Sequence, residues 1–162
     1  FKILNLQSPY IEKAIADCCK IKKTIVQQDE KEKNLRKVLN LGHTFAHAYE
    51  AALGYSKKLN HGEAVILGIK SAAKFSMENK FLTKKKYNKI QSHINYLNLP
   101  NNLNKFFSKK NINLILNFMK SDKKNNSANI NLILLKDIGK PIININFKIE
   151  KIRKFFKNEL LN

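Results

Sequence analysis

The segment HGEAVILGIKSAA spans residues 61–73, and its apolar side chains lie nearly all the way round a helix. Its apolar members are Ala64, Val65, Ile66, Leu67, Ile69, Ala72 and Ala73. A helix that is apolar on most sides is buried on most sides, so we expect this one at the centre of a core. The chain has 162 residues, of which 43% are hydrophobic, and this is enough apolar material to build such a core.

Helical patterns also precede this central segment. Ser8-Pro9 marks a helix start, and apolar residues recur at helical spacing down to about Gln28. A second helix is predicted from about Leu35 to Leu53, with Gly54 as its stop. A short loop then leads into the central helix, which begins near His61.

The remaining segments follow the central helix. Thr83 is expected to cap a helix that ends before Pro100, and a shorter helix is predicted around residues 111–120. Residues 129–135 and 142–146 are predicted to be the two strands of a β-hairpin, with a turn at residues 136–139. Residues 148–161 are predicted to form a closing amphipathic helix. The predicted fold class is a mainly α domain with a small β-hairpin near the C-terminus, and we expect the whole chain to be a single domain.

The composition is strongly basic, with 31 Lys and Arg against 12 Asp and Glu and a net charge of +19. Clustered cations can neutralise phosphates, so a basic helical module that binds nucleic acid is one interpretation. The excess is almost all lysine scattered among asparagines, a pattern that a coding bias toward these residues also produces. No apolar run approaches the ~18 residues of a membrane span, so no membrane partner is expected.

The chain termini and cysteines add little to this interpretation. The first residue is Phe1 rather than Met, so we expect the natural start to lie upstream. The adjacent Cys18 and Cys19 are expected to be small buried side chains in a reducing compartment.

The second predicted helix carries a polar stripe. At about 100° per residue, Arg36, Asn40, His43 and His47 fall within an arc of roughly 60° on a continuous helix. A lone histidine on a helix is usually a hydrogen-bonded core residue. Burying the whole stripe would leave unpaired donors, so we predict a cleft wall that faces a polar ligand.

His61 adds a third imidazole to this region, because the short loop before it folds the next helix back antiparallel. Three histidines so placed are compatible with Zn²⁺, which takes neutral imidazole nitrogens together with a carboxylate or water. The HExxH arrangement of metalloproteases is excluded, because Thr44 follows His43. For Glu63, a favourable charge in the first helical turn is the better interpretation than metal ligation.

Two motifs, LNLGHTFAHAYE over residues 39–50 and NHGEAV over residues 60–65, resemble the C-terminal domain of the 3-dehydroquinate synthase family. The segments at 18–36 and 120–141 extend the resemblance over nearly the whole chain. The HGE motif with an upstream histidine also occurs in the related iron-containing alcohol and glycerol dehydrogenases.

The resemblance implies roles for individual residues. It implies that His43 and His61 bind the metal, and that His47 and Glu32 transfer protons. The residues that it implies for substrate binding are Lys22, Arg36, Lys37, Val38, Leu39, Asn40 and Lys123.

The resemblance also implies the reaction, a lyase step of the shikimate pathway toward chorismate and the aromatic amino acids. It converts 3-deoxy-arabino-heptulosonate 7-phosphate, a phosphorylated sugar acid, into 3-dehydroquinate and phosphate. The implied cofactors are Zn²⁺ or Co²⁺ and NAD⁺. The implied N-terminal NAD-binding domain is absent from this chain, as is the glutamate that forms the third metal ligand. A cytoplasmic homodimer is the implied assembly.

Other interpretations stay open on sequence alone. Another sugar-phosphate cyclase or a metal-dependent polyol dehydrogenase would share the scaffold. Glu32, Arg36, Asn40 and Lys123 together favour the synthase, because a simple dehydrogenase has no phosphate to place. A folded but inactive partial gene product is a further alternative.

Overall fold

A computed structural model of the chain describes residues 2–121 and 129–161. The chain divides into two compact units, Phe1–Leu39 and Asn40–Asn162. Within the described residues, no helix combines the length and apolarity needed to cross a membrane.

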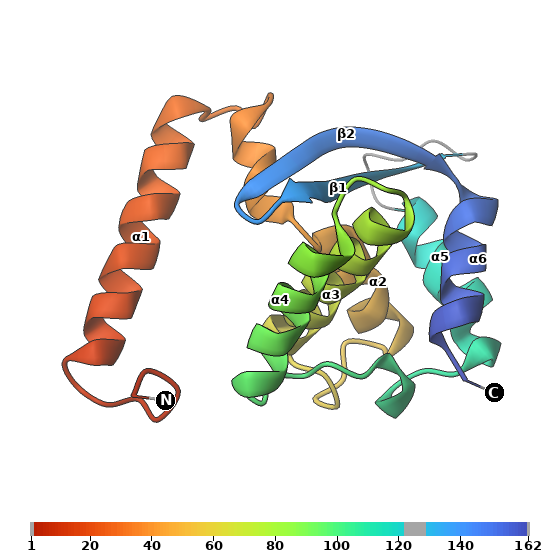
Figure 1. Cartoon of the computed structure of the whole chain (residues 1–162), viewed down its shortest axis with the longest axis horizontal. Coiled ribbons are helices and arrows are strands. Elements are labelled where there is room, and N and C mark those ends of the chain that lie inside the picture. The colour runs from red at the N-terminus through yellow and green to blue at the C-terminus, as the bar shows by residue number, and fades with distance from the viewer. Residues whose placement is uncertain (1, 122–128, 162) are drawn as a thin grey trace. The chain divides into compact units, whose positions relative to one another are not determined.

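The first unit is built on one long helix, α1 (Tyr10–Gln28), which confirms the helix predicted after Ser8-Pro9 (Figure 1). None of the 19 residues of α1, all of which the structure describes, is buried. Cys18 and Cys19 are therefore exposed, and the expectation that they are buried was wrong. Helical spacing alone could not reveal this, because an apolar stripe is buried only where another element covers it.

The second unit contains the central helix and the hairpin, and its fold class is the predicted one (Figure 1). Its elements are α2 (His43–Ala52), α3 (His61–Glu78), α4 (Lys84–Tyr96), the short 3₁₀ turns η2 (Leu103–Lys105) and η3 (Lys109–Asn111), α5 (Ile112–Ser121), β1 (Asn129–Asp137), β2 (Lys140–Lys148) and α6 (Ile149–Glu159). Thr83 caps α4 as predicted, since its hydroxyl accepts a hydrogen bond from the Lys86 amide.

The prediction of one continuous helix from Leu35 to Leu53 was wrong. A 3₁₀ helix, η1 (Leu35–Asn40), is followed by a break, and α2 begins only at His43. Gly42 makes the break, because its φ of +82° lies in the left-handed region that ends a helical turn. The stripe from Arg36 to His47 is therefore not one helical face, although His43 and His47 still share a face of α2.

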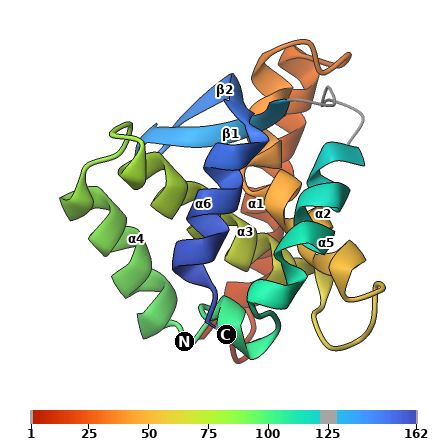
Figure 2. The same cartoon turned by 90° about the vertical axis from the view of Figure 1, so that its right-hand side faces the viewer.

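The core of the second unit contains a cluster of aromatic rings. The Phe45 ring on α2 lies 6.1 Å from the rings of Phe155 and Phe156 on α6 and 6.5 Å from that of Phe75 on α3. These side chains are almost fully buried, as is Tyr49 on the next turn of α2. Figure 2 shows α6 and α5 side by side, with α3 behind them. The buried side chains of Phe45 and Tyr49 therefore anchor α2 in the core.

The antiparallel hairpin of β1 and β2 covers part of α3 and is joined to it by a buried hydroxyl. The Ser76 hydroxyl donates a hydrogen bond to the Ala72 carbonyl at 2.6 Å and accepts one from the Leu135 amide at 2.9 Å. The turn at Ile138 and Gly139 connects the strands where the sequence predicted it. The hairpin thus packs on α3 near its C-terminal end.

Helices α2 and α3 approach each other closely at two glycines. A Cβ atom built on Gly68 of α3 would overlap the Gly42 carbonyl oxygen, and one built on Gly42 would lie 2.5 Å from the Ile69 nitrogen. Two turns further along α2, the buried Tyr49 hydroxyl is hydrogen bonded to the Ser71 hydroxyl at 2.8 Å. The contacts at both places set the spacing between α2 and α3.

We expect Gly68→Ala to destabilise the second unit, because the added methyl group forces the backbones of α2 and α3 apart. The loss in free energy of unfolding should be about 1–3 kcal/mol or more, as for other overpacked sites. Denaturant unfolding measures it. Gly62→Ala is the matched control on the same helix, since its Cβ meets nothing within 4 Å and alanine is the better helix former. Equal unfolding midpoints for the two variants would contradict the proposed close packing.

Candidate metal and substrate site

Three imidazole rings lie together, two of them on α2 and one at the start of α3. The ring centroid of His43 lies 5.5 Å from that of His47 and 6.0 Å from that of His61. The centroids of His47 and His61 are 6.3 Å apart. His43 and His47 are one turn apart on α2, and His61 is the first residue of α3. The structure therefore brings His61 to the two histidines of α2, as expected from the short loop between the helices.

The His43 ring is half-buried, and its surroundings favour the neutral form. Burial lowers its pKa, and the neighbouring His47 and His61 rings act in the same direction. A long hydrogen bond of 3.4 Å joins His43 Nδ1 to the Leu41 carbonyl. Because a carbonyl oxygen only accepts, this contact places the proton on Nδ1 and leaves the lone pair of Nε2 available. A neutral imidazole with one available nitrogen is the form that binds a metal ion.

The His61 ring has a partner of a different kind. Its Nδ1 lies 3.0 and 3.1 Å from the two carboxylate oxygens of Glu50, near the end of α2. Sequence reasoning overlooked Glu50. The available signal was its position seven residues after His43 and three after His47, which places all three side chains on one face of α2.

His43 and His61 are the candidate metal ligands among the described residues. Across residues 2–121 and 129–161, no three side chains of His, Cys, Asp or Glu are grouped so that they could hold one. His43 and His61 nevertheless have the chemistry of metal ligands, since each ring has its Nδ1 beside a carbonyl or a carboxylate. The chemistry of His43 and His61 therefore fits a metal ion, with these two rings as candidate ligands.

Glu63 does not take part in this cluster. Its carboxylate accepts a hydrogen bond from the Asn60 amide at 2.9 Å and forms a capping box at the start of α3. This confirms the interpretation of Glu63 as a residue of the first helical turn.

In the first unit, the loop that leads to Arg36 is organised around Asp29. The Asp29 carboxylate accepts hydrogen bonds from the amides of Arg36, Asn34 and Lys33 at 3.0, 2.8 and 2.9 Å. These bonds, that from Arg36 above all, lower the pKa of Asp29. The Arg36 guanidinium donates to the Glu30 carbonyl at 2.7 Å, which fixes one of its nitrogens.

The other predicted site residues lie in several places. Glu32 is in the Asp29 loop, has a φ of +52°, and donates its amide to the Asp29 carbonyl. Lys22 is exposed on α1. Lys37, Val38, Leu39 and Asn40 are half-buried residues of η1. Lys123 lies outside the described residues.

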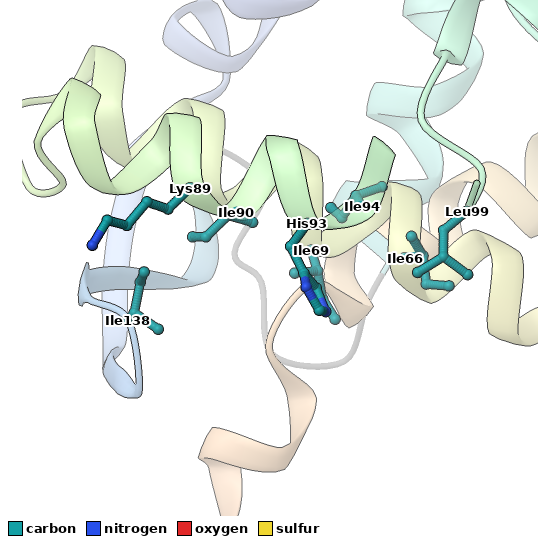
Figure 3. Close-up of a pocket in the computed structure, with 8 residues that line it drawn as sticks. All are labelled: Ile66, Ile69, Lys89, Ile90, His93, Ile94, Leu99 and Ile138. Carbon is teal, nitrogen blue, oxygen red and sulfur yellow. The ribbon is translucent and has the colours of Figure 1, made fainter. Parts of the chain in front are cut away.

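One apolar pocket is formed by residues other than these. It holds about 380 Å³ in the second unit and is lined by Ile66, Ile69, Lys89, Ile90, His93, Ile94, Leu99 and Ile138 (Figure 3). The six aliphatic side chains offer no donor to a phosphate or a carboxylate, and only Lys89 and His93 carry polar groups. A polar substrate therefore fits the histidine cluster better than this pocket.

The family model for the 3-dehydroquinate synthase C-terminal domain matches residues 1–125. The chain belongs to this family. The resemblance noticed in the two histidine motifs is thereby confirmed.

Relatives of the family cover almost the whole chain. A 3-dehydroquinate synthase of Pelagibacter ubique is 57% identical over 98% of the chain, and one of Thermoanaerobacter pseudethanolicus is 37% identical over 97%. The chain spans 43% and 42% of the lengths of these two relatives. It therefore corresponds to less than half of such a protein.

Solved structures share the fold of this family member at low sequence identity. A 2-deoxy-scyllo-inosose synthase, complexed with carbaglucose-6-phosphate, NAD⁺ and Co²⁺, matches 95% of the chain and 43% of its own with a TM-score of 0.77 and 23% identity. A 2-epi-5-epi-valiolone synthase from Streptomyces hygroscopicus, with NAD⁺ and Zn²⁺ bound, matches 83% of the chain and 36% of its own with a TM-score of 0.67 and 20% identity. The two-unit chain thus has the fold of one part of these longer enzymes.

Proposed function

We propose that this chain is the metal- and substrate-binding domain of a 3-dehydroquinate synthase, a lyase of the shikimate pathway. The observation that carries the proposal is the 57% identity over 98% of the chain to a protein of that name. The proposed reaction turns 3-deoxy-arabino-heptulosonate 7-phosphate into 3-dehydroquinate and phosphate. The other sugar-phosphate cyclases are only 20–23% identical and support the fold alone.

The proposed metal ligands in this chain are His43 and His61, with Zn²⁺ or Co²⁺ as the ion. Their ring centroids lie 6.0 Å apart. Close backbone contacts at Gly42, just before α2, and at Gly68 on α3 fix the spacing of the two helices that carry them. When bound, the metal supplies a Lewis acid and NAD⁺ supplies a hydride acceptor and donor for the alcohol that is transiently oxidised. The proposed NAD⁺ site and the third metal ligand belong to the N-terminal domain, outside this chain.

The proposed substrate residues supply fixed cations and an amide. A carboxylate and a phosphate need such partners, and the planar guanidinium of Arg36 can hold either one in a bidentate pair. Lys22 and Lys123 add two point charges, and Asn40 adds a side chain that both donates and accepts. Lys37, Val38 and Leu39 are proposed to line the same stretch of η1.

The proposed proton-transfer residues are His47 and Glu32. The His47 ring is exposed beside the other two histidines, so a bound substrate can reach it without displacing a core side chain. An imidazole moves protons near neutral pH because its ordinary pKa lies there. Glu32 is proposed as a second proton acceptor, held in the loop that Asp29 organises.

The experiment that tests the function measures phosphate release by the full-length protein from 3-deoxy-arabino-heptulosonate 7-phosphate with NAD⁺. It is repeated after chelation and after Zn²⁺ is restored. Release that returns with Zn²⁺ and yields 3-dehydroquinate supports the proposal. A folded, metal-loaded protein that releases no phosphate would instead belong with the sibling cyclases or dehydrogenases.

The proposed partners follow from the same function. We propose that the chain works with its N-terminal NAD⁺ domain as part of a cytoplasmic homodimer. Sedimentation equilibrium of the full-length protein tests the oligomeric state, and a monomer at working concentration would refute the homodimer.

A further inference from the structure

Glu50 carries a largely buried carboxylate in a strongly basic protein. It lies near the end of α2, and only 12% of its side chain is exposed. Its backbone carbonyl accepts hydrogen bonds from the amides of Leu53 and Tyr55 at 3.2 and 2.8 Å, which anchors this turn. Its neighbour Tyr49 is fully buried against the core. The Glu50 backbone is therefore anchored, and its side chain is largely enclosed.

His61, in contrast, is not held by packing. Its side chain is 61% exposed, and it is the first residue of α3, where no preceding helical turn restricts it. The contact with both Glu50 oxygens, at 3.0 and 3.1 Å, is the polar tether that the structure gives to this ring. Without that tether, the ring is free to adopt other rotamers.

The tether also determines which ring nitrogen carries the proton. An ionised carboxylate only accepts hydrogen bonds, so Nδ1 of His61 must be the donor. The lone pair then resides on Nε2, on the opposite side of the ring from Glu50. A negative charge next to Nδ1–H also makes Nε2 a stronger electron donor.

We propose that Glu50 is a positioning residue for the metal, because it orients the His61 ring and sets its tautomer. The proposal rests on the proposed function, in which His61 is a metal ligand. The backbone carbonyl of Leu41 orients the His43 ring in the corresponding way. A side-chain mutation cannot remove this carbonyl. Glu50 is the partner whose removal can be tested.

The experiment measures Zn²⁺ affinity of the full-length protein in competition with a chromophoric chelator, without any turnover. Glu50→Ala should weaken Zn²⁺ binding by about 10–100-fold, as is typical when a ligand loses its hydrogen-bonded support. Glu50→Gln should weaken it less, because the amide oxygen still accepts from Nδ1 but carries no charge. Glu63→Gln is the matched control, a second carboxylate near His61 that bonds the Asn60 amide instead, and its affinity should equal that of the unaltered protein.

A purely structural role for Glu50 gives a different result. If Glu50 only links α2 to α3, its variants lower the melting temperature of the metal-free protein and leave Zn²⁺ affinity unchanged, which would overturn the proposal. Should Glu50→Ala fail to fold, the near-isosteric Glu50→Gln decides in the same way. The variant His61→Ala distinguishes a failure of the metal site from a failure of the role proposed for Glu50. Unchanged Zn²⁺ affinity in that variant refutes the metal site itself, whereas lost affinity there with normal affinity in both Glu50 variants refutes only the role of Glu50.

Discussion

Replacing His43 with alanine should empty the metal site of the full-length protein and remove nearly all of its turnover. His43 is the first residue of α2, its ring centroid lies 6.0 Å from that of His61, and its burial favours the neutral imidazole. Because two ligands are proposed from this chain, loss of one would leave a single imidazole for the metal. A Lewis acid stabilises the transition state by several kcal/mol, so its loss should slow turnover about 10³-fold or more.

Atomic absorption on the purified variant measures the metal, and phosphate release measures turnover. His93→Ala is the matched control, because His93 is an exposed histidine on α4 that lines the apolar pocket and lies outside the cluster. Exposed substitutions of this kind usually change stability by no more than about 0.5 kcal/mol. A His43→Ala protein with its full complement of metal would refute the assignment of His43 as a ligand.

Replacing His47 with alanine should separate metal binding from turnover. The His47 ring is exposed and lies one turn after His43, with its centroid 5.5 Å from that of His43. Because it is proposed to transfer a proton and not to bind the metal, the variant should keep its metal. Its turnover should fall by about 10²–10⁴-fold, the usual contribution of a general acid or base.

Added imidazole gives this prediction a second measurement. A small base that diffuses into the space left by the side chain should restore part of the turnover in His47→Ala and none in His43→Ala, where the metal is missing. Undiminished turnover in His47→Ala would remove His47 from the mechanism. Loss of metal in the same variant would make it a ligand instead.

The helices and the hairpin were predictable because their signals are local. The apolar residues around α3, the cap at Thr83 and the alternation in β1 and β2 each act within a few residues. The same is true of Glu63, whose capping box closes on Asn60. The motif around His43 and His61 was also visible, because a resemblance to a family needs only the order of residues.

The break before α2 was not predictable from periodicity. Gly42 adopts its left-handed φ of +82° where its carbonyl packs against Gly68, 26 positions further along the chain. A pattern within residues 35–53 contains no information about that contact, so a continuous helix was the natural prediction. The same break shows that Arg36 and Asn40 do not share one helical face with His47.

The chemistry proposed for the site was therefore predicted from the identity of a few residues, whereas its geometry was decided by the packing of two helices. His43, His47 and His61 could be recognised from spacing and motif. The spacing of Glu50 places it on the same face of α2 but does not indicate its partner, because its role depends on a hydrogen bond to a residue eleven positions away on another helix. Only the approach of α2 to α3, set by Gly42, Gly68 and the Tyr49–Ser71 hydrogen bond, places that carboxylate against the ring that it orients.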